Sequence, residues 1–243
     1  MSALLKIRQL VKRFDSLAAV DGINLILKEG ERRALIGPNG AGKTTLLNLI
    51  GGQLRADAGQ ILFRDRQITH APPHVRAGWG IARTFQTSSA FSNLSVFENI
   101  LAAAQAGHGW MRYAPDIQRR AEHMLTSLGL KQKADLPEIQ LSHGERRALE
   151  IGLALASAPQ LLLLDEPTAG LSATETEQIV QLLKGLEDVA MLIVEHDMNV
   201  VQRLADSITV LHQGRVLAQG SAAEIQANAQ VQAVYLGEAY AAT

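Results

Sequence analysis

Residues 37–45 fit the spacing G-x-x-x-x-G-K-[ST], in which a glycine-rich turn, a lysine and a hydroxyl follow one another. Glycines allow tight bends that turn several backbone N–H groups towards one phosphate. Lys43 would reach the β- and γ-phosphates of a nucleotide, and the Thr44 hydroxyl would bind Mg²⁺. Before this loop, residues 33–36 read as a buried strand, and after it residues 45–50 read as a helix start. A chance glycine-rich turn is the alternative, but the register and the flanking elements favour nucleoside triphosphate binding.

Two carboxylates and a histidine follow further apolar runs. Asp165 and Glu166 come directly after the leucines of residues 161–164, and His196 comes shortly after residues 191–194. Ligands of α/β folds bind at the carboxyl ends of strands. There, one carboxylate can hold Mg²⁺ and its neighbour can polarise an attacking water molecule. Alone, these residues would be an ordinary Asp-Glu turn and a loop histidine, but together with the upstream phosphate loop they indicate hydrolysis.

The elements that must position these residues alternate along the chain. Strands are predicted at 4–10, 23–27, 33–36, 60–63, 67–68, 80–86, 161–164, 191–194, 207–211 and 215–218, with Phe14 in a loop. Helical character extends over 96–130, ending at Gly129, and helices are predicted at 142–156, capped by Ser142, and at 174–188. This order predicts an α/β fold with a mostly parallel sheet and a small antiparallel sheet against it. Residues 87–155 are expected to form a helical insertion between 1–86 and 156–243.

Composition excludes several classes of protein. The chain has 243 residues, 47% of them hydrophobic, and a net charge of −1, so no nucleic-acid partner is predicted. It has no cysteine, which excludes disulfides and a thiol nucleophile. No run reaches the roughly 18 apolar residues of a membrane span, and residues 1–15 lack the apolar centre of a signal peptide. We expect a protein that is soluble by itself and reaches a membrane only through a partner.

The motifs together resemble those of ATP-binding cassette (ABC) ATPases over essentially the whole chain, 1–243. In family order they are the P-loop at 37–45, the Q-loop Gln86, the signature at 141–145, the Walker-B strand at 161–165 with Glu166, and the switch His196. The resemblance implies one cassette with a P-loop NTPase (RecA-like) core, a small antiparallel β subdomain and an inserted α-helical subdomain.

The resemblance also implies roles for individual residues. Phe14 would stack on adenine, unless it is simply an exposed loop side chain, and Val20 would pack beside the nucleotide. Mg²⁺ would be held by Thr44, Gln86 and Asp165, and Gln86 would also contact the attacking water. Glu166 would be the general base and His196 would contact the γ-phosphate. The ATP phosphates would be cradled by Asn39, Gly40, Ala41, Gly42, Lys43, Thr44 and Thr45.

In this family two cassettes sandwich ATP head to tail, so Ser142 and Gly144 would contact the γ-phosphate of the other subunit's ATP. A second ATPase subunit, identical or different, is therefore an expected partner. Two positions depart from the usual pattern. His143 replaces a glycine of the signature, with Glu145 in place of its glutamine, and Ser172 replaces an Asp or Asn. The last departure weakens the expectation of the usual carboxylate contact across the dimer.

Subfamily features are similar to ATPases of bacterial branched-chain (hydrophobic) amino-acid importers, and they lie at 82–86, 195–198 and 234–238. Such importers imply two transmembrane permease subunits and a periplasmic binding protein, with this chain peripheral at the cytoplasmic face of the inner membrane. Part of 88–97 would line the groove for a permease helix. The signature also resembles urea and short-amide importers, and together with the tail it resembles lipopolysaccharide exporters. A non-transport ABC ATPase and a P-loop kinase are less favoured, since the chain has one cassette and no apparent lid.

Overall fold

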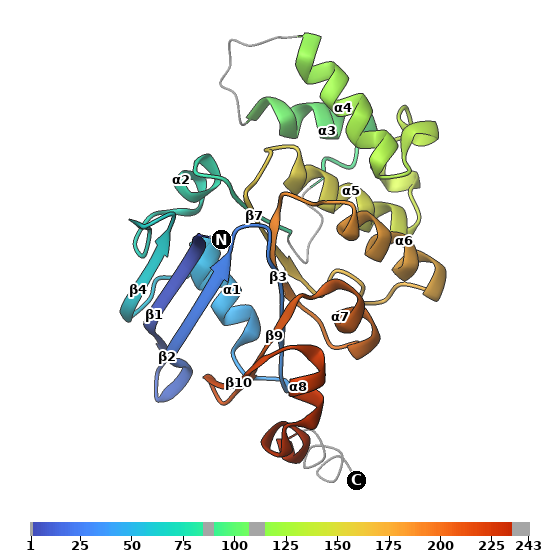
Figure 1. The fold of residues 1–243 in the computed structure, drawn as a ribbon. Helices are drawn as coiled ribbons and strands as arrows, with labels where there is room; N and C mark the ends of the chain where they lie inside the picture. The colour runs from blue at the N-terminus through green and yellow to red at the C-terminus, as the bar shows by residue number, and fades with distance from the viewer. Residues whose placement is uncertain (1, 85–89, 107–114, 235–243) are drawn as a thin grey trace.

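A computed structural model describes residues 2–84, 90–106 and 115–234, and it contains two sheets (Figure 1). The antiparallel sheet has the order β2-β1-β4-β5. Its strands are β1 (Ala3–Phe14), β2 (Leu17–Lys28), β4 (Ala58–Phe63) and β5 (Arg66–Gln67). The second sheet has the order β10-β9-β3-β8-β7-β6 and is parallel except for the β9–β10 hairpin. Its strands are β3 (Arg32–Ile36), β6 (Ile81–Arg83), β7 (Leu161–Asp165), β8 (Ala190–Val194), β9 (Ser207–His212) and β10 (Arg215–Gly220).

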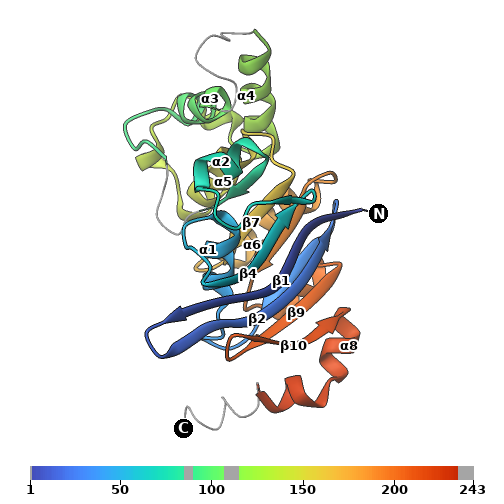
Figure 2. The same cartoon turned by 90° about the vertical axis from the view of Figure 1, so that its left-hand side faces the viewer.

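Helix α1 (Lys43–Gly51) lies between the two sheets, as Figure 2 shows. Side chains alternate along β7, so Leu161 and Leu163 share a core with α1 and the antiparallel sheet. Leu162 and Leu164 face the opposite way and pack with the helices on the other side. Those helices are α5 (His143–Leu155), α6 (Ala173–Lys184) and α7 (Met198–Leu204). A strand that is apolar on both faces is therefore buried on both faces, as its run of leucines predicts.

Helices α3 (Val96–Ala106) and α4 (Pro115–Ser127) stand at one end of the molecule beyond α5 (Figure 1). Val96, Ile100 and Leu125 join the same core cluster as the apolar face of α5. After α4, the N–H of Leu130 donates to the carbonyl of Leu125 at 2.8 Å. Gly129 has a φ of +70°, the left-handed conformation that this type of helix end requires, so its predicted role is confirmed. Short 3₁₀ turns at Lys131–Lys133 and Glu138–Gln140 then lead into α5.

The structure corrects several predicted boundaries. Phe14 ends strand β1 instead of lying in a loop. Within the predicted strand 4–10, regular alternation breaks at a β-bulge: Gln9 has a φ of +46° and is exposed, and Leu10 is buried. Three short helices were not predicted, namely α2 (Pro73–Gly78), α7 and α8 (Ala222–Ala227). Each has only six or seven residues, too few for a periodic apolar pattern to stand out.

Within the described ranges, no helix combines the length and the apolar character that crossing a membrane would require.

Candidate functional site

The phosphate loop joins the end of β3 to α1, and its glycines are required by geometry. Gly42 has a φ of +99°, and a Cβ there would lie 2.2 Å from the carbonyl oxygen of Ala19 at the start of β2. A Cβ on Gly37 would lie 2.1 Å from the carbonyl oxygen of Leu211 in β9. The loop is therefore held between the antiparallel sheet and the β9–β10 hairpin, with Asn39 and Gly40 exposed and Ala41 buried.

Within the described residues, the N-terminus of α1 has neither a side-chain cap nor an acidic residue in its first turn. The backbone N–H groups there and the helix dipole favour an anion. Lys43 is buried, with 6% of its surface exposed, and its Nζ donates to the carbonyl oxygens of Gly37 and Pro38 at 2.5 and 2.8 Å. Thr44 is exposed and Thr45 is half-buried. This arrangement places a buried positive charge at the start of a helix whose dipole favours an anion, as phosphate binding requires.

Asp165 lies at the end of β7 against the phosphate loop. The Thr44 hydroxyl is 3.4 Å from its Oδ1, and Arg83 Nη2 of β6 is 3.2 Å from its Oδ2. Burial raises the pKa of Asp165 above its usual value; the charge of Arg83 opposes this rise, and the charge of Glu166 adds to it. A carboxylate that is poorly solvated and paired with a hydroxyl suits a hard cation such as Mg²⁺, which takes one or two protein oxygens together with phosphate oxygens. Among the described residues there is no cluster of three potential ligands that would hold a metal without such help.

Glu166 follows Asp165 in a left-handed backbone conformation, with a φ of +49°. Its Oε1 is 2.8 Å from His196 Nε2, so the structure brings the predicted base and the predicted switch histidine together. Both side chains are partly exposed, at 34% for Glu166 and 46% for His196. The strands explain the meeting, because β7 and β8 are parallel neighbours and their carboxyl ends lie at one edge of the sheet.

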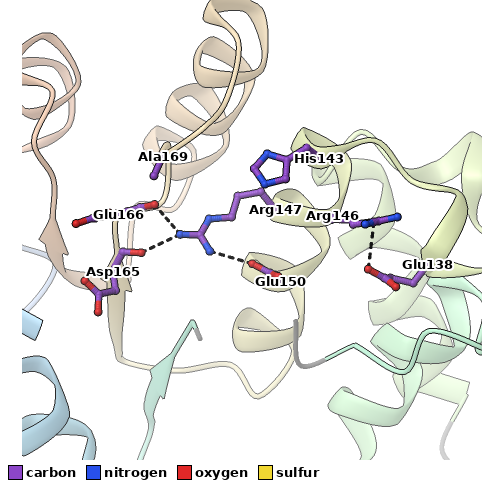
Figure 3. A pocket seen from close by; sticks show the side chains of 8 residues that line it. All are labelled: Glu138, His143, Arg146, Arg147, Glu150, Asp165, Glu166 and Ala169. Atoms are coloured by element: carbon purple, nitrogen blue, oxygen red, sulfur yellow. Dashed lines mark hydrogen bonds and ion pairs between the residues drawn. The ribbon is translucent and has the colours of Figure 1, made fainter. Parts of the chain in front are cut away.

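Two side chains without a role predicted from the sequence hold the turn after β7. Arg147 of α5 donates to the carbonyl oxygens of Asp165 and Glu166 (Figure 3) and also to that of Pro167. Glu195, at the end of β8, is buried, and its Oε1 accepts from both the N–H and the hydroxyl of Thr168, at 3.0 and 2.7 Å. The available signal for Arg147 was its i,i+3 spacing from Glu150 on an otherwise apolar helix face.

The predicted signature lies at the start of α5. Ser142 caps the helix in a reciprocal pair with Glu145, so the predicted cap is confirmed. The N–H of Gly144 donates at 3.0 Å to Oε1 of Glu175, which belongs to the first turn of α6. Ser172 caps α6 and pairs with the same Glu175 carboxylate. Within one chain, therefore, the signature end already contacts a carboxylate.

A cavity of about 300 Å³ separates the signature end of α5 from the carboxylates of β7. His143 and Arg147 line it from α5, and Figure 3 shows Arg147 extending towards Asp165 and Glu166, which line its other side. Glu138, Arg146, Glu150 and Ala169 complete its lining.

The remaining predicted residues have different outcomes. Phe14 is 44% exposed at the end of the hairpin whose strand β2 borders the phosphate loop, with Lys12 Nζ 5.4 Å from its ring centre. Val20 is fully buried in the core, and its contact with the nucleotide stays a prediction. Gln86 lies outside the described residues.

Comparisons with known proteins agree with this geometry. A model of the ABC transporter family matches residues 20–169, and a model of the branched-chain amino acid ATP-binding cassette transporter matches 215–241. LivG of Salmonella typhimurium, a high-affinity branched-chain amino acid transport ATP-binding protein, is 37% identical over 97% of this chain and 98% of its own. LptB of Acidithiobacillus ferridurans, a lipopolysaccharide export system ATP-binding protein, is 35% identical over 99% of both chains.

A solved structure has nearly the same fold as this chain. MJ1267, an ATP-binding cassette of an ABC transporter in its ADP conformation, superposes with a TM-score of 0.89 at 30% identity, covering 98% of this chain and 100% of that one. The predicted α/β fold with an antiparallel sheet is confirmed. By its motifs, fold and relatives, the chain belongs to the ABC transporter family and is an ATP-hydrolysing cassette of the kind that powers a membrane transporter.

Proposed function

We propose that this cassette powers an importer of branched-chain amino acids. The observation that carries the catalytic part is the order of three parallel strands, β3, β8 and β7, whose carboxyl ends carry the phosphate loop, His196 and the Asp165-Glu166 pair. The substrate class is supported by the matching model over 215–241 and by the name of the relative LivG. The cassette itself would not touch the amino acid.

ATP would bind with its phosphates at the N-terminus of α1 and its adenine on Phe14. Lys43 would exchange its two loop carbonyls for phosphate oxygens, which as charged acceptors form the stronger hydrogen bonds. Thr44 and Asp165, together with Gln86, would hold Mg²⁺, which screens phosphate charge when bound. Because Thr44 and Asp165 already lie within 3.4 Å of each other, little rearrangement is needed.

Glu166 would orient the attacking water and accept its proton. His196, which contacts Glu166 in this structure, would hold the carboxylate on one side and contact the γ-phosphate on the other. Ser142 and Gly144 would complete the site from a second cassette, identical or different. In this scheme residues 87–155 form the subdomain that presents the signature, and 1–86 with 156–243 form the core that holds ATP.

The assembly would contain two transmembrane permease subunits and a periplasmic binding protein, with the cassettes on the cytoplasmic face of the inner membrane. A second candidate is lipopolysaccharide export, which is favoured by the similarity to LptB along the whole chain. The two candidates share the ATPase chemistry and differ in the partner subunits and the transported molecule.

The test is purification of the native complex from membranes through a tag on this chain, followed by mass spectrometry and reconstitution into liposomes. We expect permeases, a second cassette and an amino-acid-binding protein, with ATP hydrolysis stimulated by the binding protein loaded with leucine, isoleucine or valine. Glu166→Gln should retain ATP binding and lose this stimulated turnover. Recovery of lipopolysaccharide with the complex would favour export, and recovery with ribosomes or DNA alone would contradict transport.

A further inference from the structure

The turn that carries Glu166 has an unusual backbone anchor. Three successive carbonyl groups, those of Asp165, Glu166 and Pro167, point at one guanidinium, that of Arg147. The distances are 2.9 Å and 2.7 Å from Nη2 to the first two oxygens and 3.0 Å from Nε to the third. Figure 3 shows this side chain crossing from α5 to the end of β7.

The anchor acts where the backbone is strained. Glu166 has a φ of +49°, a left-handed conformation that costs free energy in residues other than glycine and persists only where surrounding contacts enforce it. Hydrogen bonds to the carbonyls on both sides of this residue fix the peptide planes that set its orientation. The Glu166 side chain itself is held at its tip by His196 alone among the described hydrogen-bond partners.

Arg147 is itself held in place. Its side chain is only 13% exposed, and its Nη1 donates to Oε2 of Glu150, one turn along the same helix, at 2.9 Å. The planar guanidinium presents several donors in fixed directions, whereas a lysine ammonium is a compact point charge on a flexible stem. A lysine therefore keeps the charge at this position but cannot hold all three carbonyls in the same geometry.

We propose that Arg147 is a positioning residue for hydrolysis: it sets the backbone of the Glu166 turn and so the place of the carboxylate relative to the attacking water. This inference rests on the proposed role of Glu166 as the base. It also links two parts of the machinery, because Arg147 and Gly144 are three residues apart on α5 and lie on the same helix face. A shift of the signature end of α5 would be transmitted through the guanidinium to the base of the same chain.

The test compares Arg147→Lys and Arg147→Met in the native complex purified through a tag on this chain. We expect kcat to fall about 10- to 100-fold, the effect of a small misplacement of a reacting group. ATP affinity, measured by equilibrium binding, should stay within about twofold, since Arg147 contacts no residue of the phosphate loop. Arg147→Met removes a half-buried charge, so we expect this variant to have a lower melting temperature. Arg147→Lys keeps the charge, and its loss of activity is therefore easier to separate from a loss of stability.

Two controls separate positioning from general stability. Arg203→Lys changes an arginine of α7 that pairs with Glu177 of α6 and does not line the cavity, and it should leave kcat unchanged. The same Arg147→Lys change in a Glu166→Gln background should produce no further loss, because the group it positions is already disabled.

Three results would overturn the proposal. The first is an equal loss in both backgrounds, the second is an unchanged kcat for Arg147→Lys, and the third is a loss of ATP affinity that matches the loss of turnover. If Glu166→Gln alone hydrolysed ATP at the unmodified rate, the assignment of the base would fail, and the role of Arg147 would fail with it.

Discussion

The N-termini of α1 and α5 are both predicted to bind phosphate, yet they differ in how their first backbone N–H groups are capped. Within the described residues, α1 begins at Gly42 with no capping side chain and no acidic residue in its first turn. Helix α5 begins with a reciprocal Ser142–Glu145 cap, and its Gly144 N–H also contacts Glu175. A glycine at the N-cap costs a helix only about a few tenths of a kcal/mol relative to a capping side chain, so α1 can begin at Gly42 without such a cap at little cost in stability.

The comparison teaches that one site is open to an anion and the other already contacts one. Helices α6 and α8 begin with the same Ser-x-x-Glu cap as α5, which makes this cap the ordinary way in which this chain starts a helix. The signature end therefore keeps an ordinary cap and has one N–H that Glu175 must release before a phosphate can take it.

The largest expected effect concerns the N-terminus of α1. Lys43→Ala should weaken ATP binding to the isolated chain by about 100-fold, since it removes a charge-assisted hydrogen bond to phosphate. Equilibrium titration with a fluorescent ATP analogue measures it. Ser142→Ala should bind the analogue normally in the same assay; equal weakening by both variants would show that the two helix ends are not distinct sites.

Ser142→Ala should affect turnover instead of binding. Loss of the cap should lower the free energy of unfolding by about 1 kcal/mol, and kcat of the complex should fall about tenfold through the lost phosphate contact. Ser221→Ala is the matched control, because Ser221 caps α8 in the same way. A similar drop in kcat for the control would mean that activity follows stability alone.

Glu175→Gln should have the opposite effect to Ser142→Ala, because it should favour phosphate binding at the N-terminus of α5. Removing the carboxylate charge weakens its contact with Gly144, so the ATP concentration for half-maximal hydrolysis should fall about two- to fivefold. Glu224→Gln in α8 breaks the same kind of cap without touching the signature. If both variants shift the ATP dependence alike, Glu175 does not compete with phosphate.

The smallest effect concerns pH. The N–H and hydroxyl of Ser172, followed by the N–H of Gly144, lower the pKa of Glu175. A carboxyl whose pKa is lower in the folded state adds stability above its unfolded pKa, and this contribution is lost as the pH falls through the folded pKa. The melting-temperature difference between wild type and Glu175→Gln should therefore be full at pH 7 and shrink below about pH 4. A constant difference would contradict the contact.

The site residues that could be predicted from the sequence are those whose placement depends on neighbouring residues in the chain. The P-loop glycines, Asp165, Glu166 and His196 follow apolar strands directly, so a short stretch of chain carries both the residue and its placement. Arg147, Glu175 and Glu195 act through partners 18 to 31 positions away, and no spacing rule connects them.

The contacts between the phosphate loop and the β9–β10 hairpin have a consequence for the synthesis of the protein. Gly37 packs against Leu211, and the N–H of Gly214 donates to the carbonyl of Ala41 at 3.1 Å. The residues predicted to bind phosphate are thus synthesised early, whereas part of the contact surface of their loop comes from the last sixth of the chain. A nascent chain arrested before the β9–β10 hairpin would carry the complete glycine-rich motif without the geometry to use it. ATP binding should accordingly appear late in translation, after these distant contacts close.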